Sequence, residues 1–166
     1  MNPLQWSFRT RCLLGFAICL ALLGFALYSQ LHTGLEPCPL CVFQRIAFAA
    51  VGLILLFAGL HAPKAAVVRA SYGLFALLAA VLGIAIAGRQ VWLQHLPPEQ
   101  VPMCGPGLNY LVEAMPLTSV IRKVLTGSGE CARVDWTFLG FSMAEWSLLW
   151  FIFLAAWAGL LLVRRR

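Results

Sequence analysis

Residues 42–60 read VFQRIAFAAVGLILLFAGL, an almost entirely apolar stretch whose two polar side chains, Gln44 and Arg45, stand near its start. A membrane-spanning helix needs about 20 predominantly apolar residues to cross a hydrocarbon core of about 30 Å. Three further stretches meet this requirement and carry no charged residue; they are 12–28, 71–88 and 146–163. Because backbone groups in lipid must be hydrogen-bonded within the segment, we expect four helices rather than strands.

The composition of the 166-residue chain also indicates a membrane protein. Hydrophobic residues make up 61% of the sequence and charged residues 11%, whereas soluble domains carry about 25% charged residues. A disordered chain is excluded because disorder requires low hydrophobicity and high charge. The net charge of +6 calls for no nucleic acid partner, since basic residues at the ends of membrane spans explain it as well. We predict an all-α integral membrane protein in the lipid bilayer, a four-transmembrane-helix bundle forming one domain over 1–166.

The charges outside these stretches predict the orientation of the chain. One side would hold seven basic residues and no acidic ones, namely Arg9, Arg11, Lys64, Arg69, Arg164, Arg165 and Arg166. The other side would hold five basic and six acidic residues. The positive-inside rule places the first group in the cytoplasm. We therefore expect both termini to be cytoplasmic and two loops, about 29–41 and 89–145, to lie on the outer side.

The first apolar stretch, 12–28, follows basic residues and could be mistaken for a signal peptide. No small-residue cleavage site follows it, so we expect a retained span. Cys12 and Cys19 share one face of this helix, about 10 Å apart at 1.5 Å per residue, which is too far for a disulfide. We interpret both as packing residues.

The other four cysteines fall in the two outer loops, where disulfides persist. Cys38 and Cys41 form a C-x-x-C motif at the start of the second span, and Cys104 and Cys131 can pair across most of the long loop. A C-x-x-C bridge closes so short a loop that it removes little chain entropy, and its usual value is that it is easily reduced and re-formed. The pattern therefore favours redox chemistry.

Two other roles for the four outer cysteines stay open at this point. Two disulfides could staple the loops of a membrane protein without enzymatic activity. Four thiolates could hold zinc, although a zinc site usually offers two C-x-x-C pairs, whereas Cys104 and Cys131 are 27 positions apart. We favour a site without a metal.

The surroundings of Cys41 favour redox chemistry further. Cys41 stands at or just before the first turn of a helix, where free backbone N–H groups and the helix dipole stabilise a thiolate. Arg45 is four residues later, so it shares a helical face with Cys41. An arginine one turn inside a span costs free energy unless it snorkels to the headgroups. Beside a C-x-x-C motif, we favour a functional arginine that supports the thiolate or binds an electronegative ligand.

The electron acceptor is suggested only by elimination. The sequence has no motif for a nucleotide, an attached haem or an iron–sulfur cluster, whereas a lipid-soluble quinone matches the location and the two-electron chemistry. His95 could line an interfacial pocket, but a solvated loop histidine is the simpler interpretation. Trp136 belongs to an aromatic group expected at the membrane interface, and some of that group could line an acceptor pocket. Residues 120–125 fit a surface amphipathic helix or a loop packed on itself equally well.

Longer motifs around these positions resemble the DsbB family, the disulfide bond formation protein B of bacterial inner membranes. In chain order they are PCPLCVFQR at 37–45, GRQVW at 88–92, MCGP at 103–106, ECA at 130–132, Trp136 and FLG at 138–140. The resemblance covers essentially the whole chain. It implies a multi-pass protein of the bacterial inner (cytoplasmic) membrane with two periplasmic loops and an active site on the periplasmic side.

The resemblance also implies a membrane thiol:quinone oxidoreductase. A periplasmic DsbA-like thioredoxin-fold oxidase would be the partner, and its reduced thiol would attack Cys104 and open a Cys104–Cys131 disulfide. Electrons would then reach the Cys38–Cys41 disulfide, with a Cys38–Cys131 mixed bridge as one route, and pass to the membrane quinone pool. Cys41 would face the quinone, ubiquinone or menaquinone, as a thiolate, and Arg45 would support the complex.

Two alternatives belong to other classes. An enzyme like vitamin K epoxide reductase also places a C-x-x-C motif and a loop pair on four spans, but its C-x-x-C would lie near the last helix. Here the motif opens the second helix. The other alternative is a non-enzymatic membrane interaction protein whose disulfides are structural, in which replacing Cys41 would alter stability and no electron flow.

Overall fold

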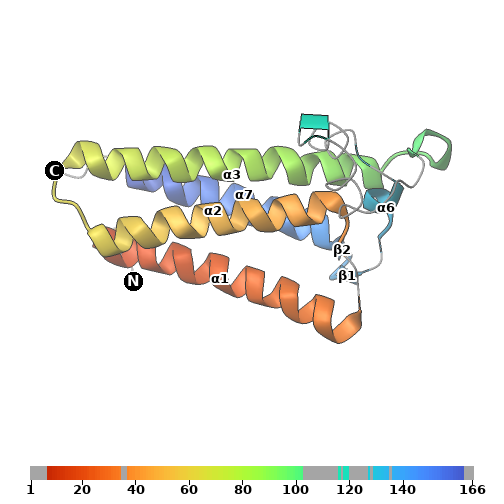
Figure 1. Ribbon diagram of the computed structural model, residues 1–166, viewed down its shortest axis with the longest axis horizontal. Helices are drawn as coiled ribbons and strands as arrows, with labels where there is room; N and C mark the ends of the chain where they lie inside the picture. Colours follow the sequence, from red (N-terminus) through yellow and green to blue (C-terminus); the bar gives the residue numbers. More distant parts are fainter. Residues whose placement is uncertain are drawn as a thin grey trace.

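Four long helices form the body of the molecule in the computed structural model, which describes residues 7–34, 37–102, 116, 118–119, 127, 129–134 and 136–162. They are α1 (Phe8–Thr33), α2 (Pro39–His61), α3 (Ala66–Gln94) and α7 (Met143–Leu162). All four are long and apolar enough to cross a membrane, and they lie side by side as a bundle (Figure 1). The predicted four-helix membrane fold is confirmed, whereas the single domain over 1–166 stays a prediction.

Local chemistry sets the ends of α1 and the start of α2. The hydroxyl of Ser7 accepts the backbone N–H of Thr10 at 3.2 Å and so caps α1. At the other end Gly34 has a φ of 66°, a left-handed conformation that a residue without a Cβ adopts at no steric cost. Cys38 is the N-cap of α2 and Pro39 occupies its first turn, where the fixed φ of proline suits a helix and its missing N–H is not needed.

The helices extend beyond the predicted spans. The stretches 12–28, 42–60 and 71–88 lie inside α1, α2 and α3, and 146–162 lies inside α7, while residue 163 is outside the described residues. A helix pairs its backbone groups in water as well as in lipid, so it need not end where the apolar stretch ends. For this reason α3 continues past residue 88 and carries Gln90 and Gln94 to the end of the bundle where the C-x-x-C motif lies.

The core is built by close approach of small residues to large ones. Phe151 of α7 stacks on Phe48 of α2, with ring centroids 3.9 Å apart, and a Cβ added at Gly83 of α3 would collide with the Phe151 ring. Cys12 and Cys19 are buried in the same core and are free thiols. Their burial agrees with the interpretation of both cysteines as packing residues.

The two ends of the bundle differ in their elements and charges. The α2–α3 connection and the chain termini lie at one end (Figure 1), and the short elements lie at the other. These elements are η2 (Pro98–Gln100), α6 (Gly129–Ala132), β1 (Thr137–Phe138) and β2 (Phe141–Ser142). Strands β1 and β2 pair antiparallel, with Phe138 opposite Phe141. We refer to this as the hairpin end.

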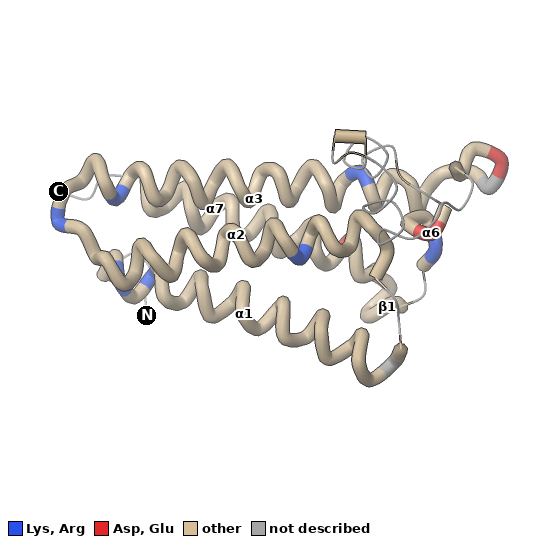
Figure 2. The backbone as a smooth tube through the Cα atoms, viewed as in Figure 1, with Lys and Arg blue, Asp and Glu red and all other residues tan. Residues whose placement is uncertain are grey.

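The two ends of the bundle differ in their basic and acidic residues, and the positive-inside rule assigns the more basic end to the cytoplasm. Figure 2 shows that the charged segments at the end with the termini are all blue, whereas red and blue segments occur together towards the hairpin end. Among the described residues the acidic ones are Glu99, Glu130 and Glu145. The separation agrees with cytoplasmic termini, although the sidedness of the chain stays a prediction.

Candidate functional site

The C-x-x-C motif lies at the hairpin end, where α2 begins. The sulfur of Cys38 accepts the backbone N–H of Cys41 at 3.3 Å, and the two Sγ atoms are 2.7 Å apart. Both cysteines are free thiols in this structure. Since a disulfide joins sulfurs at about 2.05 Å, the pair can bridge after a small movement of the side chains. The predicted Cys38–Cys41 disulfide stays a prediction.

A third cysteine lies against this pair. Cys131 of α6 is almost fully buried, together with Leu40 and Leu93, and Cys38 packs against this small cluster. Hydrogen bonds to the side chains of Cys131 and Cys41, together with burial, raise the pKa of the Cys38 thiol well above its ordinary value. Cys38 is therefore held as a protonated thiol between two other sulfurs.

The structure thus brings together three of the four predicted catalytic cysteines. Cys38 and Cys41 come from the start of α2, and Cys131 comes from α6, ninety positions later in the chain. Cys104 lies outside the described residues. The Cys104–Cys131 disulfide consequently stays a prediction, and so does the amphipathic helix expected at 120–125, where no residue is described.

Arg45 reaches from α2 to α1. Its guanidinium donates one hydrogen bond to the side-chain oxygen of Gln30 and another, of 3.1 Å, to the backbone carbonyl of Ala26. Arg45 and Cys41 line the same cavity, as the spacing of four residues predicts. The arginine therefore fixes the distance between α1 and α2 beside the C-x-x-C motif.

Two buried amides lie at the C-x-x-C motif, one in direct contact with it and one behind the first, and neither was predicted to have a role. Gln90 of α3 donates from Nε2 to the sulfur of Cys41 at 3.3 Å and to the sulfur of Cys38 at 3.5 Å. Gln44 of α2 donates from Nε2 to Oε1 of Gln90 at 2.7 Å. Both side chains are 4% exposed. The sequence signal for such a role is weak: Gln44 is a polar residue inside the apolar stretch 42–60, and Gln90 lies just past the end of the apolar stretch 71–88.

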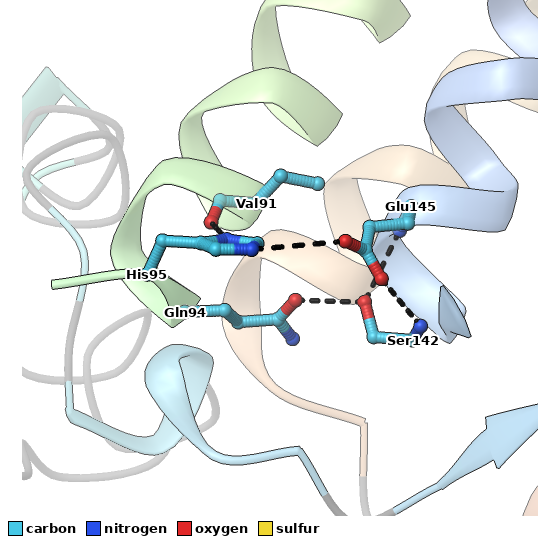
Figure 3. Close-up of polar contacts among 5 residues, drawn as sticks. All are labelled: Val91, Gln94, His95, Ser142 and Glu145. Carbon is cyan, nitrogen blue, oxygen red and sulfur yellow. Dashed lines mark hydrogen bonds and ion pairs between the residues drawn. The ribbon is translucent and has the colours of Figure 1, made fainter. Parts of the chain in front are cut away.

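His95 lies at a junction between α3 and α7 (Figure 3). Its Nε2 is 3.9 Å from Glu145 and its Nδ1 is 2.8 Å from the carbonyl of Val91. Glu145 also accepts the backbone N–H of Ser142, and the Ser142 hydroxyl accepts the N–H of Glu145, which makes a capping box for α7. Ser142 donates to Gln94 at 2.8 Å. His95 is absent from the described lining of the cavity, so its visible role is in this junction.

A cavity of about 1250 Å³ lies beside the cysteines. Its polar part is formed by the C-x-x-C motif, Arg45 and the two amides, and its apolar part comes largely from α1 and α7. The apolar lining includes Leu22, Phe25, Ala26, Met143 and Trp150. Figure 1 shows α1 diverging from α2 towards the hairpin end, which leaves room on this side of the bundle. An apolar wall with a few convergent polar groups suits a ring with polar oxygens and a lipid tail.

Trp136 belongs to a row of aromatic rings beside this cavity. Its ring is 6.0 Å from Phe25 of α1 and 6.1 Å from Phe138 of the hairpin. Phe138 is in turn 6.1 Å from Trp146 of α7. All four rings line the cavity, so the aromatic group that the sequence placed at the membrane interface also borders the space next to the thiols.

The arrangement defines a class of protein. A sulfur in contact with two others, as Cys38 is, can exchange disulfides with both, and it lies where membrane helices enclose a partly apolar cavity. These features describe a membrane thiol–disulfide oxidoreductase.

Comparison with known proteins gives the family. The chain matches the model of the family described as disulfide bond formation protein DsbB over residues 8–161. Proteins named disulfide bond formation protein B from Xanthomonas euvesicatoria and Xanthomonas axonopodis are each 53% identical over 158 residues, covering 95% of this chain and 92% of the relative. The one from Xylella fastidiosa is 52% identical and covers 93% of this chain and 90% of the relative. The chain belongs to the DsbB family and is an oxidoreductase of disulfide bond formation.

Proposed function

We propose that this protein oxidises the dithiol of a periplasmic DsbA-like thioredoxin-fold protein and passes the electrons through two cysteine pairs to a quinone of the inner membrane. The observation that carries the proposal is the contact of Cys38 with both Cys41 and Cys131 at the edge of a cavity that Arg45 also lines. The site lies towards the hairpin end, where Figure 2 shows both acidic and basic segments, and opposite the end whose charged segments are all basic, which supports a periplasmic position.

The first half of the reaction takes place in the loop pair. A thiolate of the donor attacks Cys104 of the Cys104–Cys131 disulfide, and that S–S bond breaks as a mixed disulfide forms. The second donor thiol then resolves the mixed disulfide. The donor leaves with a new disulfide, and its two electrons stay in the Cys104–Cys131 dithiol.

The second half moves these electrons to the C-x-x-C pair. Cys131 attacks Cys38, with which it is already in contact, and the Cys38–Cys41 bond breaks with Cys41 as the leaving thiolate. Cys41 lies in the first turn of α2, where helix N–H groups and the dipole stabilise negative charge. Cys104 then attacks Cys131, which restores the loop disulfide and releases Cys38 reduced.

A quinone bound in the cavity would accept two electrons and two protons from the Cys38–Cys41 dithiol, re-forming that disulfide. Arg45 would hold such a ring, because it lines the same cavity as the C-x-x-C motif and its guanidinium is held by a hydrogen bond to α1. The apolar side chains from α1 and α7 would contact the rest of the molecule and exclude water.

The test is quinone reduction by the purified protein, followed by absorbance, with a reduced DsbA-like protein as donor. We expect turnover that is lost when any one of Cys38, Cys41, Cys104 or Cys131 is changed to serine. A Cys12→Ala, Cys19→Ala double variant is the control, because these two cysteines lie in the helical core, and it should retain turnover.

No turnover with ubiquinone or menaquinone, in a folded protein with both disulfides formed, would overturn the proposal in favour of structural disulfides. Electron flow in the opposite direction, from quinol to the donor disulfide, would favour an enzyme like vitamin K epoxide reductase. The sign of the change in quinone absorbance distinguishes quinone reduction from quinol oxidation, and the size of the change measures turnover.

A further inference from the structure

The amide of Gln90 occupies a position that the chemistry described above does not use. It is almost fully buried, it comes from α3, and its nitrogen lies within hydrogen-bond distance of both sulfurs of the C-x-x-C motif. A buried amide needs partners for its polar atoms. Here the partners of its N–H groups are the two sulfurs themselves.

Gln44 determines which end of the Gln90 amide faces the sulfurs. Its Nε2 donates to Oε1 of Gln90 at 2.7 Å, which occupies that oxygen as an acceptor and leaves Nε2 of Gln90 to donate to the sulfurs. The Cys41 thiol can donate to Oε1 of Gln90 at 3.6 Å, whereas Nε2 of Gln90 donates to the Cys41 sulfur at 3.3 Å. The donor end of the amide is therefore the nearer of the two to Cys41.

We propose that Gln90 is a positioning residue for Cys41: its amide N–H holds the Cys41 sulfur as a thiolate whenever the Cys38–Cys41 bond is open, and Gln44 keeps that amide in the donating orientation. Hydrogen bonds to a charged acceptor are about twice as strong as neutral ones. The thiol form has only a weak donor to offer in return. The contact thus favours the thiolate over the thiol.

Arg45 does not replace this contact. The hydrogen bonds that the structure records for its guanidinium go to Ala26 and Gln30 of α1 and not to the Cys41 sulfur. Among the described residues, the other ionisable groups that act on the Cys41 thiol or line its cavity include Cys38, Cys131, Glu130 and Arg133. Gln90 offers an N–H donor to the Cys41 sulfur without adding a charge inside the membrane.

The inference is tested on the thiol itself, without donor or quinone. In the full-length reduced protein carrying Cys38→Ala, the rate of Cys41 alkylation by iodoacetamide is measured against pH, with the modified peptide identified by mass spectrometry. Gln90→Met keeps the approximate size of the side chain and removes the N–H donors. We expect the midpoint of the profile to move up by about one pH unit, so that alkylation at neutral pH slows about tenfold.

Two further variants make the result decisive. Gln94→Met changes a glutamine one turn later on α3 that bonds to Ser142 instead, and it should leave the midpoint of Cys41 unchanged. Gln44→Met leaves Gln90 in place without its orienting partner, and it should shift the midpoint in the same direction by a smaller amount. If Gln90→Met does not fold, Gln44→Met decides the question.

An unchanged midpoint in folded Gln90→Met, or in Gln44→Met if that variant alone folds, would overturn the assignment. An equal shift in Gln94→Met would also overturn it, because the effect would then come from general loosening of α3. The importance of Gln90 for turnover rests on the proposed function, whereas its effect on the Cys41 thiolate does not. Failure of quinone reduction in the unaltered protein would leave the alkylation result intact, so the two failures are distinguishable.

Discussion

At the scale of single residues, Arg45→His tests the residue assigned to the acceptor site. The variant loses the hydrogen bonds of the guanidinium to Ala26 and Gln30, which tie α1 to α2 beside the cavity. Because hydrogen bonds of charged groups are worth about 1.5–3 kcal/mol, we expect the apparent KM for quinone to rise by about tenfold or more. Arg89→Met removes a positive charge from α3 and is the control. An unaltered KM in Arg45→His would show that its assigned role is wrong.

Arg45 and the cysteines could be predicted from the sequence, whereas the glutamines could not. A charge inside an apolar span and a C-x-x-C motif are conspicuous in any sequence, because both conflict with their surroundings. Gln44 and Gln90 are uncharged, and single glutamines near the ends of membrane helices are common. Their importance lies in the 2.7 Å contact between α2 and α3, which depends on helix packing and leaves no pattern in the sequence.

Cys38 should show an unusual pH dependence. Its thiol pKa is raised, chiefly by the hydrogen bond to Cys131 and then by the contact with Cys41 and by burial. A raised pKa means that the reactive thiolate forms only at higher pH, so Cys38 in the reduced protein should be alkylated more slowly than an exposed cysteine up to about pH 9. Cys131→Ala removes the largest cause and should move the alkylation profile of Cys38 to lower pH. A profile that does not move would show that Cys131 is not in contact with Cys38 in solution.

At the scale of elements, the existence of the four helices could be predicted and their ends could not. Hydropathy marks the part of a helix that lies in lipid, and the apolar stretch of α3 stops at residue 88 whereas the helix ends at Gln94. The next turn carries Gln90, Gln94 and the residues beside His95. Polar residues there hydrogen-bond to α2 and to the start of α7, and this tertiary pairing stabilises a helical turn that the sequence pattern would assign to a loop.

The packing of α3 on α7 gives a prediction at this scale. Any side chain at Gly83 would collide with the ring of Phe151, which is itself stacked on Phe48. We expect Gly83→Leu to lower the free energy of unfolding by about 1–3 kcal/mol or more, as overpacking does. Gly88→Ala on the same helix is the control, since a Cβ there meets nothing within 4 Å. Thermal unfolding in detergent, followed by circular dichroism, compares the two. Equal stability would mean that α3 and α7 do not pack in this register.

At the scale of the whole molecule, the sequence predicts a four-helix bundle with separated charges, and the described residues agree with both. The sequence suggested an acceptor pocket beside the aromatic group of Trp136 but not its helical walls, because the spans are apolar on every face and do not reveal which faces meet. The divergence of α1 from α2 towards the hairpin end and the aromatic row from Phe25 to Trp146 arise from packing between segments far apart in the chain. These features place an apolar cavity next to the thiols.

In the proposed mechanism, electrons from both cysteine pairs leave the protein only through Cys38 and Cys41. The most direct test mixes fully reduced protein, without a donor, with excess quinone under anaerobic conditions and counts the quinol formed. We predict two quinols per molecule of the unaltered protein, one for the Cys104→Ala, Cys131→Ala variant and none for Cys38→Ala, Cys41→Ala. Quinol formed at an undiminished rate by the last variant would contradict the account, because the loop dithiol would then reduce quinone without the C-x-x-C pair.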